Sequence, residues 1–249
     1  MNYRNFYNKY ASQRNNLKSI HDSDYHIIRF LIRKYDSTLL TVLNEVISDE
    51  MVVVDIGCGG GYFLNLISSY NVQLVGLEIS DIEIDRARQN IAKDNISLIQ
   101  HDLSFGLPFK NDSVDIIFNS SVLEHLENPE HMIREAYRVL KKSGKIIGRT
   151  PNKYSLMEIG SKILSESGLR RVLNKPDPGH ISLFTEKYLS DCLTTSDFQI
   201  DYIDCSGLYI PGFRLFNFRI FTSLFKMIDR FSDYTKRINW VILYCATKK

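Results

Sequence analysis

The sequence is poor in cysteine, in long apolar runs and in net charge. Its four cysteines form no C-x-x-C pair and lie mostly in apolar stretches, so we expect reduced, buried thiols and neither a disulfide nor zinc. No apolar run reaches the roughly 18 residues that a membrane-spanning helix needs, and residues 1–20 lack an apolar signal-like core. We therefore expect a cytoplasmic chain that is neither secreted nor membrane-spanning.

Excess charge of one sign is scarce as well. The formal net charge is +2, with 24% charged and 44% hydrophobic residues among 249, which is ordinary globular usage and enough for one large core. This balance does not indicate a nucleic-acid-binding stripe, so no nucleic-acid partner is expected. Because neither an internal repeat nor a low-complexity linker divides the chain, we expect a single domain over 1–249, with its oligomeric state left open.

Three regions differ in their hydrophobic pattern. Residues 1–48 carry apolar side chains at helical spacing and predict helices that pack on a sheet and cover its ligand as a lid. Residues 49–150 alternate strand and helix patterns five times, which is typical of a parallel α/β sheet and predicts the ligand-binding core. Residues 151–249 are expected to hold substrate-side inserts and the final strands, near Phe198–Asp204 and Trp240–Thr247.

The most informative motif is the run from Val52 to Tyr62, where three valines and an acid precede four glycines within five positions. The valines predict a buried strand of a parallel sheet. The glycines allow positive φ and a close approach of the backbone to a ligand. A helix after Tyr62 would direct its first amides at that ligand.

The spacing of the glycines separates two kinds of nucleotide site. Counted with Gly57 as the first position, the dinucleotide fingerprint needs a glycine at the sixth, where this chain has Tyr62. Four further stretches follow in order: Leu74–Ser80, Ile96–Leu103, Ser113–Leu126 and Arg138–Asn152. Together with Asp55-x-Gly57-x-Gly59-x-Gly61 they resemble the motifs of the class I S-adenosylmethionine-dependent methyltransferases, most closely the small-molecule type 11 group and its quinone-biosynthetic O-methyltransferases.

The resemblance implies a Rossmann-like, seven-stranded α/β sheet that is mostly parallel with an antiparallel last strand, helices on both faces and helical lid elements. It implies S-adenosylmethionine as the cofactor and methyl transfer to a small-molecule acceptor, for which we favour an oxygen nucleophile. In this reading Glu78 accepts the ribose hydroxyls, while Asp102 and Leu103 hold the adenine. The implied cofactor contacts are Asp55, Gly57, Cys58, Gly59, Gly61, Glu78, Ile79, Asp102, Leu103 and Asn119.

Each of these acids has a structural alternative, because Asp favours turns and helix N-caps. Alone, Asp55 or Asp102 would more often be structural. Three acids at successive strand ends favour a shared ligand, since open α/β sheets bind ligands at the carboxyl ends of their strands.

Two histidines are candidates for acid–base catalysis. His125 follows the fourth predicted strand, and His180 lies in a segment resembling the H-x-x-x-F-T segment that crosses the substrate mouth of many small-molecule members. The structural alternative, a backbone contact that holds a loop, is favoured for His125 and is about as plausible as catalysis for His180. His101, His125, His131 and His180 lack the ligand spacing and accompanying carboxylates of a metal site, so no metal is expected.

Substrate choice is expected to lie in the inserts. Residues 213–237, read as a helix, place Arg219, Lys226, Arg230 and Arg237 opposite an apolar face. A cap helix on the core is the simpler interpretation, and contact with an anionic membrane or a lipid-linked substrate is the alternative. The turn after the fourth strand lacks the Asn-Pro-Pro-aromatic pattern of base-amine methylation. A catalytically silent cofactor-binding partner subunit and a nicotinamide oxidoreductase stay open as other functions.

Overall fold

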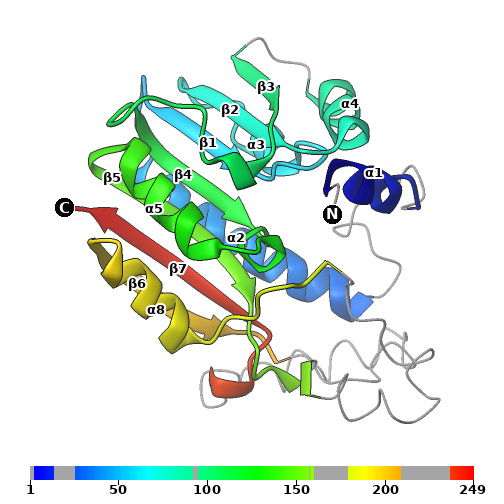
Figure 1. Cartoon of the computed structure of the whole chain (residues 1–249), viewed down its shortest axis with the longest axis vertical. Coiled ribbons are helices and arrows are strands. Elements are labelled where there is room, and N and C mark those ends of the chain that lie inside the picture. The colour runs from blue at the N-terminus through cyan, green and yellow to red at the C-terminus, as the bar shows by residue number, and fades with distance from the viewer. Residues whose placement is uncertain (1–2, 14–25, 92–94, 157, 160–178, 209–235) are drawn as a thin grey trace.

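The computed structural model describes residues 3–13, 26–91, 95–156, 158–159, 179–208 and 236–249 (Figure 1). Seven strands form one sheet in the order β3-β2-β1-β4-β5-β7-β6. The strands are β1 Val52–Ile56, β2 Gln73–Glu78, β3 Ile96–Gln100, β4 Val114–Ser120, β5 Leu140–Pro151, β6 Phe198–Ser206 and β7 Val241–Lys248. This order confirms the predicted Rossmann-like sheet.

The first five strands are all parallel, and β7 is antiparallel to both of its neighbours, β5 and β6. The order reverses at β1, which lies between β2 and β4. Such a switch point opens a crevice beyond the carboxyl ends of the strands, where open α/β sheets bind their ligands. The glycine turn follows β1 directly, so the fold puts the turn at that crevice.

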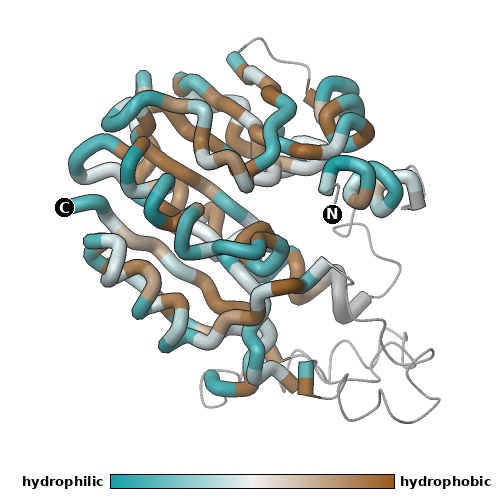
Figure 2. Tube along the Cα trace, viewed as in Figure 1, coloured by the Kyte–Doolittle hydropathy of each residue, from teal (hydrophilic) through white to brown (hydrophobic). Residues whose placement is uncertain are grey.

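Helices cover both faces of the sheet (Figure 1). One face packs on α5 (Pro129–Val139) and α8 (Glu186–Thr195), and the other packs on α2 (His26–Val46) and α3 (Tyr62–Leu66). Two separate apolar clusters fill these layers, and Figure 2 shows the apolar strands between helices that have polar outer sides. The alternation of strand and helix patterns thus gives three layers. All four cysteines are free and buried, as predicted.

The helix α2 is fixed to the sheet by more than apolar packing. Asp36 on α2 forms an ion pair with Arg149 on β5 at 3.1 Å, and both side chains are more than 90% buried. Arg149 also donates from Nε to the Ser120 hydroxyl on β4 at 2.8 Å. The predicted N-terminal helical region therefore includes one helix, α2, that belongs to the core of the sheet.

Two connections next to the parallel strands are short. The helix after the glycine turn, α3, has only five residues, and residues Leu123–His125 after β4 form a 3₁₀ turn, η3. The strand β5 begins at Leu140, directly after α5, and its pairing with β4 changes register between Leu140 and Lys145. Within the described ranges no helix is long and apolar enough to cross a bilayer. Most of the insert 213–237 lies outside the described residues.

Candidate functional site

The glycine turn leaves a space where a ligand can approach the backbone. Gly59 has φ +52°, and a Cβ built there would meet no atom within 4 Å. Gly57, with φ +69°, is different, because its Cβ would lie 2.6 Å from a methyl group of Val122. The turn thus packs its first glycine against the segment after β4 and keeps Gly59 open.

Glu78, at the end of β2, holds the turn in place. One carboxylate oxygen accepts from the amide of Gly59 at 3.0 Å, and the other accepts from the amides of Ile79 and Ser80 at 2.9 Å each. Burial raises the pKa of Glu78, and the backbone hydrogen bonds oppose this shift. A carboxylate has about four acceptor positions. For Glu78 to accept both ribose hydroxyls, the Gly59 amide has to release its oxygen.

Asp55, the last but one residue of β1, is a buried carboxylate with 3% of its surface exposed. Burial and the negative charge of Glu78 raise its pKa well above the usual value. Within the described part of the chain its side chain has no hydrogen-bond partner, unlike Glu78. A buried acid without a partner is costly for the fold, which makes Asp55 a candidate for a ligand contact.

Asp102 and Leu103 follow β3 at the same edge of the sheet. One Asp102 oxygen caps the 3₁₀ turn η2 (Leu103–Phe105) by accepting from the Ser104 amide at 2.9 Å. This is the contact expected by the structural alternative, and it uses only one oxygen of the carboxylate. Leu103 is buried in the core.

The loop that carries Asp102 is held by an ion pair on α5. Glu135 and Arg138 pair at 2.7 Å. Arg138 also donates to the carbonyls of Leu107 and Phe109, and Glu135 accepts from the Leu107 amide. The Arg138 guanidinium lowers the pKa of Glu135 to about 2. These contacts tie the loop after β3 to α5.

Two residues of the predicted site have their side chains in the core instead. The Asn119 amide is fully buried and exchanges hydrogen bonds with the hydroxyl of Tyr244 across Gly148. The Cys58 thiol is buried close to Gly76, and burial raises its pKa. The structure therefore does not bring these two side chains to the crevice, and only their backbones lie beside the turn.

The two predicted catalytic histidines come together beyond the end of β4. The rings of His125 and His180 are 5.1 Å apart between centroids, although 55 positions separate them in the chain. His125 Nδ1 lies 2.8 Å from the carbonyl of Gly179, which is the backbone contact of its structural alternative. The amides of Ile181 and Ser182 donate to the carbonyl of Glu124 at 2.8 and 2.9 Å, and so fasten the His180 segment to η3.

Beside the two histidines lies a third ionisable residue, Glu124, which no sequence motif singles out. Its side chain is fully buried, one oxygen accepts from the Thr150 hydroxyl at 3.1 Å, and Oε1 has no partner among the described residues. Burial raises the pKa of its carboxyl. One potential ligand atom from each of Glu124, His125 and His180 lies within 4.8 Å of the others. No spacing rule finds this set, because His180 comes from a distant segment.

The helix α1 (Tyr3–Gln13) contacts both the start of α4 and the histidine pair. Arg4 pairs with Asp81 at 2.8 Å, and Asn8 hydrogen-bonds Asp81 and Ser80 at the start of α4 (Asp81–Asn90), which lies beside α1 in Figure 1. At the other side, the ring of Tyr7 lies 6.0 Å from that of His125. One helix therefore contacts both the residues after Glu78 and those after β4.

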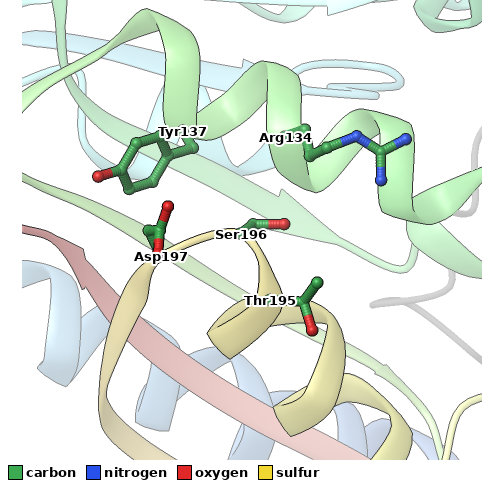
Figure 3. A pocket seen from close by; sticks show the side chains of 5 residues that line it. All are labelled: Arg134, Tyr137, Thr195, Ser196 and Asp197. Carbon is green, nitrogen blue, oxygen red and sulfur yellow. The ribbon is translucent and has the colours of Figure 1, made fainter.

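A hollow elsewhere on the protein is not part of this arrangement. Figure 3 shows it between α5 and the end of α8, lined by Arg134, Tyr137, Thr195, Ser196 and Asp197. Since the last two residues precede β6, which runs parallel to β5, the hollow lies at the amino edge of the sheet. The predicted site residues all lie at the carboxyl edge.

A mostly parallel α/β sheet, with a glycine turn and acids at three successive strand ends, defines a protein of the Rossmann-like, nucleotide-cofactor-binding class. Residues 54–148 match the family described as a methyltransferase domain. A probable S-adenosylmethionine-dependent methyltransferase from Mycolicibacterium smegmatis is 28% identical over 157 residues, covering 63% of this chain and 54% of that protein. A ubiquinone biosynthesis O-methyltransferase from Bartonella tribocorum is 28% identical over 106 residues, covering 42% and 43%.

The fold agrees with that of solved structures. The geranyl diphosphate C-methyltransferase from Streptomyces coelicolor, solved with Mg²⁺, geranyl diphosphate and S-adenosyl-L-homocysteine, has a TM-score of 0.66 at 14% identity, with 100% of this chain and 99% of that chain covered. Residues 54–148 are a class I S-adenosylmethionine-dependent methyltransferase domain, and S-adenosylmethionine is its cofactor. The chain spans about half the length of the curated relatives it matches.

Proposed function

We propose that the protein transfers the methyl group of S-adenosylmethionine to an oxygen nucleophile of a small-molecule acceptor. The observation that carries this proposal is the buried Asp55 carboxylate close enough to Glu78 to be affected by its charge, with Glu78 in turn bonded to the amide of the open glycine, Gly59. A buried acid and a half-buried acid that repel each other are stabilised by a positively charged ligand. S-adenosylmethionine has an ammonium and a sulfonium group, whereas a nicotinamide dinucleotide brings a negatively charged pyrophosphate.

Each residue then has a task that its position supports. Glu78 accepts the ribose hydroxyls, the free oxygen of Asp102 accepts from the adenine amino group, and Asp55 accepts from the ammonium group. The cofactor supplies a methyl group on a sulfonium whose leaving group is already activated. The chain has to align an acceptor, and positioning of this kind can lower a barrier by about 7–11 kcal/mol.

The acceptor side is assigned to the histidine pair. In the simplest form of the proposal, His180 removes the proton of an acceptor hydroxyl, and His125 holds the backbone of Gly179 so that the His180 segment stays in position. Curated relatives named as O-methyltransferases support the choice of oxygen. A base typically contributes about 10²–10⁴-fold to the rate.

A lid role for α1 belongs to the same proposal, because this helix contacts both sides of the crevice. The double variant Arg4→Ala/Asn8→Ala is expected to release cofactor faster than the wild type in stopped-flow measurements. Equal dissociation rates would assign α1 a purely structural role. Contact of the insert 213–237 with a membrane or a lipid-linked substrate stays a prediction.

The test has two stages. Calorimetry with S-adenosylmethionine and with NAD⁺ is expected to detect only the first ligand, and binding of NAD⁺ alone would overturn the proposal. A panel of phenols, alcohols, amines and thiols is then screened for release of S-adenosylhomocysteine. Release with hydroxyl acceptors alone supports oxygen methylation, whereas release with amines or thiols alone contradicts it. Binding without release for any acceptor would favour the catalytically silent partner subunit.

A further inference from the structure

The cluster formed by Glu124, His125 and His180 is more than a pair of catalytic histidines. Its carboxylate is fully buried, and Oε1 has no hydrogen-bond partner among the described residues. Leaving such an oxygen without a partner is unfavourable, and more so when it is charged. A cation bound at the cluster would satisfy it.

His125 has the orienting hydrogen bond that is typical of a metal ligand, and His180 lies near a carboxylate. His125 Nδ1 lies 2.8 Å from the carbonyl of Gly179, which can only accept, so Nδ1 carries the hydrogen and Nε2 keeps the lone pair. His180 Nδ1 lies 4.0 Å from a carboxylate oxygen of Glu158. Metal-binding histidines usually direct one ring nitrogen at a carbonyl or carboxylate in this way, which orients the ring and raises its basicity.

From this geometry we infer that Glu124, His125 and His180 bind one divalent transition-metal ion. Two imidazoles and a carboxylate suit Zn²⁺, Mn²⁺, Fe²⁺ or Co²⁺, whereas Mg²⁺ prefers oxygen ligands. Three protein ligands leave at least one coordination position open, as in catalytic metal sites. Ligand atoms about 2.1 Å from one ion in a tetrahedron lie about 3.4 Å apart. The ligand atoms of the cluster lie within 4.8 Å of one another, so side-chain rotation has to bring them closer by about 1.4 Å at most.

With an ion at this place, His180 is a metal ligand and not a base, because its imidazole lone pair binds the ion. The charge of the ion lowers the pKa of an acceptor hydroxyl bound at the open position. The hydroxyl proton then leaves to solvent. This role deepens the proposed function and rests on it, but metal binding itself does not, because it is measured without an acceptor.

The test uses the full chain, treated with a chelator and dialysed. Titration with Co²⁺ is expected to give visible d–d absorption that saturates at one ion per chain and is displaced by Zn²⁺. The variants Glu124→Gln and His180→Ala are expected to weaken Co²⁺ binding at least about 10-fold. The control is His131→Ala, which removes a histidine of α5 outside the cluster and is expected to bind as the wild type does.

The outcomes separate this inference from the proposed function. Circular dichroism and S-adenosylmethionine calorimetry on each variant show whether the fold and the cofactor site are intact. No stoichiometric Co²⁺ or Zn²⁺ binding by the wild type, or unchanged binding by a folded His180→Ala variant, would overturn the metal site. A cofactor that fails to bind would overturn the proposed function and leave the metal titration interpretable.

Discussion

At the scale of single residues, the glycine turn distinguishes positions that the fold requires from positions that a ligand requires. Gly57 and Gly59 both have positive φ, and an L residue there costs about 1–2 kcal/mol. Only at Gly57 would a Cβ also collide with Val122, at 2.6 Å. The two glycines are therefore a matched pair for mutagenesis.

We expect Gly59→Ala to remain folded, with a loss of about 1–2 kcal/mol, and to weaken cofactor binding. Gly57→Ala is expected to lose more stability, because the Val122 side chain has to move. Urea denaturation and calorimetry with S-adenosylmethionine measure both effects. If Gly59→Ala binds the cofactor as tightly as the wild type, the open side of the turn does not face the ligand.

We expect the Asp55 carboxylate to lower the stability of the fold while it strengthens cofactor binding. Its pKa is raised by burial and by Glu78, so the native state is penalised at pH values above the raised pKa and gains stability as the pH falls toward the unfolded value. Asp55→Asn is expected to be about 1–2 kcal/mol more stable than the wild type at high pH, with a smaller difference in acid, and to bind cofactor more weakly. A variant that is less stable at every pH would mean that the Asp55 carboxylate contributes net stability to the fold.

At the scale of elements, the contact between α5 and the loop after β3 depends on one ion pair. Glu135 has a pKa lowered to about 2 by Arg138. A lowered pKa means that the stabilisation is fully present above the ordinary carboxyl pKa of about 4.5 and is lost as the pH falls toward 2. Glu135→Gln should therefore cost about 1–2 kcal/mol at pH 6, after allowance for solvent screening, and much less at pH 2.

Denaturation at the two pH values tests this prediction. Asp85→Asn is the matched control, because Asp85 and Arg88 form a pair of the same i,i+3 spacing at 2.9 Å with both side chains mostly exposed. This control is expected to change stability little at either pH. An equal loss for Glu135→Gln at pH 6 and pH 2 would show that the ion pair does not hold the loop.

Features that lie close together in the chain could be predicted from the sequence, whereas contacts between distant elements could not. The alternation of strands and helices and the positions of Asp55, Glu78 and Asp102 could be predicted from local motifs, since a strand, a turn and an acid lie within a few residues of one another. The sequence does not reveal Glu124, because it reads as part of a short helical motif and His180 lies 56 positions away in the chain. Asn119 was assigned to the cofactor because nothing in its neighbourhood reveals Tyr244, two strands away in the sheet.

At the scale of the whole molecule, the ion pair between Asp36 and Arg149 joins α2 to the centre of the sheet. Breaking a buried pair leaves one charge uncompensated and typically costs about 3–5 kcal/mol. Asp36→Ala is therefore expected to lower the free energy of unfolding by about this amount. The control Asp191→Ala breaks an exposed pair with Lys187 and is expected to cost less than about 1 kcal/mol.

Chemical denaturation of both variants measures the difference. If Asp36→Ala fails to fold, the double variant Asp36→Leu/Arg149→Met is expected to recover a folded chain, because apolar side chains of similar volume can replace a buried pair. Similar losses for Asp36→Ala and Asp191→Ala would mean that α2 is held by apolar packing alone.

The place of β7 in the sheet has a consequence for how the chain acquires its structure. Among the described strands, β6 pairs only with β7, and β7 also covers the edge of β5. During synthesis β5 and β6 are therefore made with open edges, and an open edge is a template for pairing with another chain. The ribosome has to release residues 241–248 before either edge is closed. Until then the strands β1 to β4 can already be paired with one another, whereas the edges of β5 and β6 stay exposed. We therefore expect the nascent chain to be most prone to aggregation in this interval.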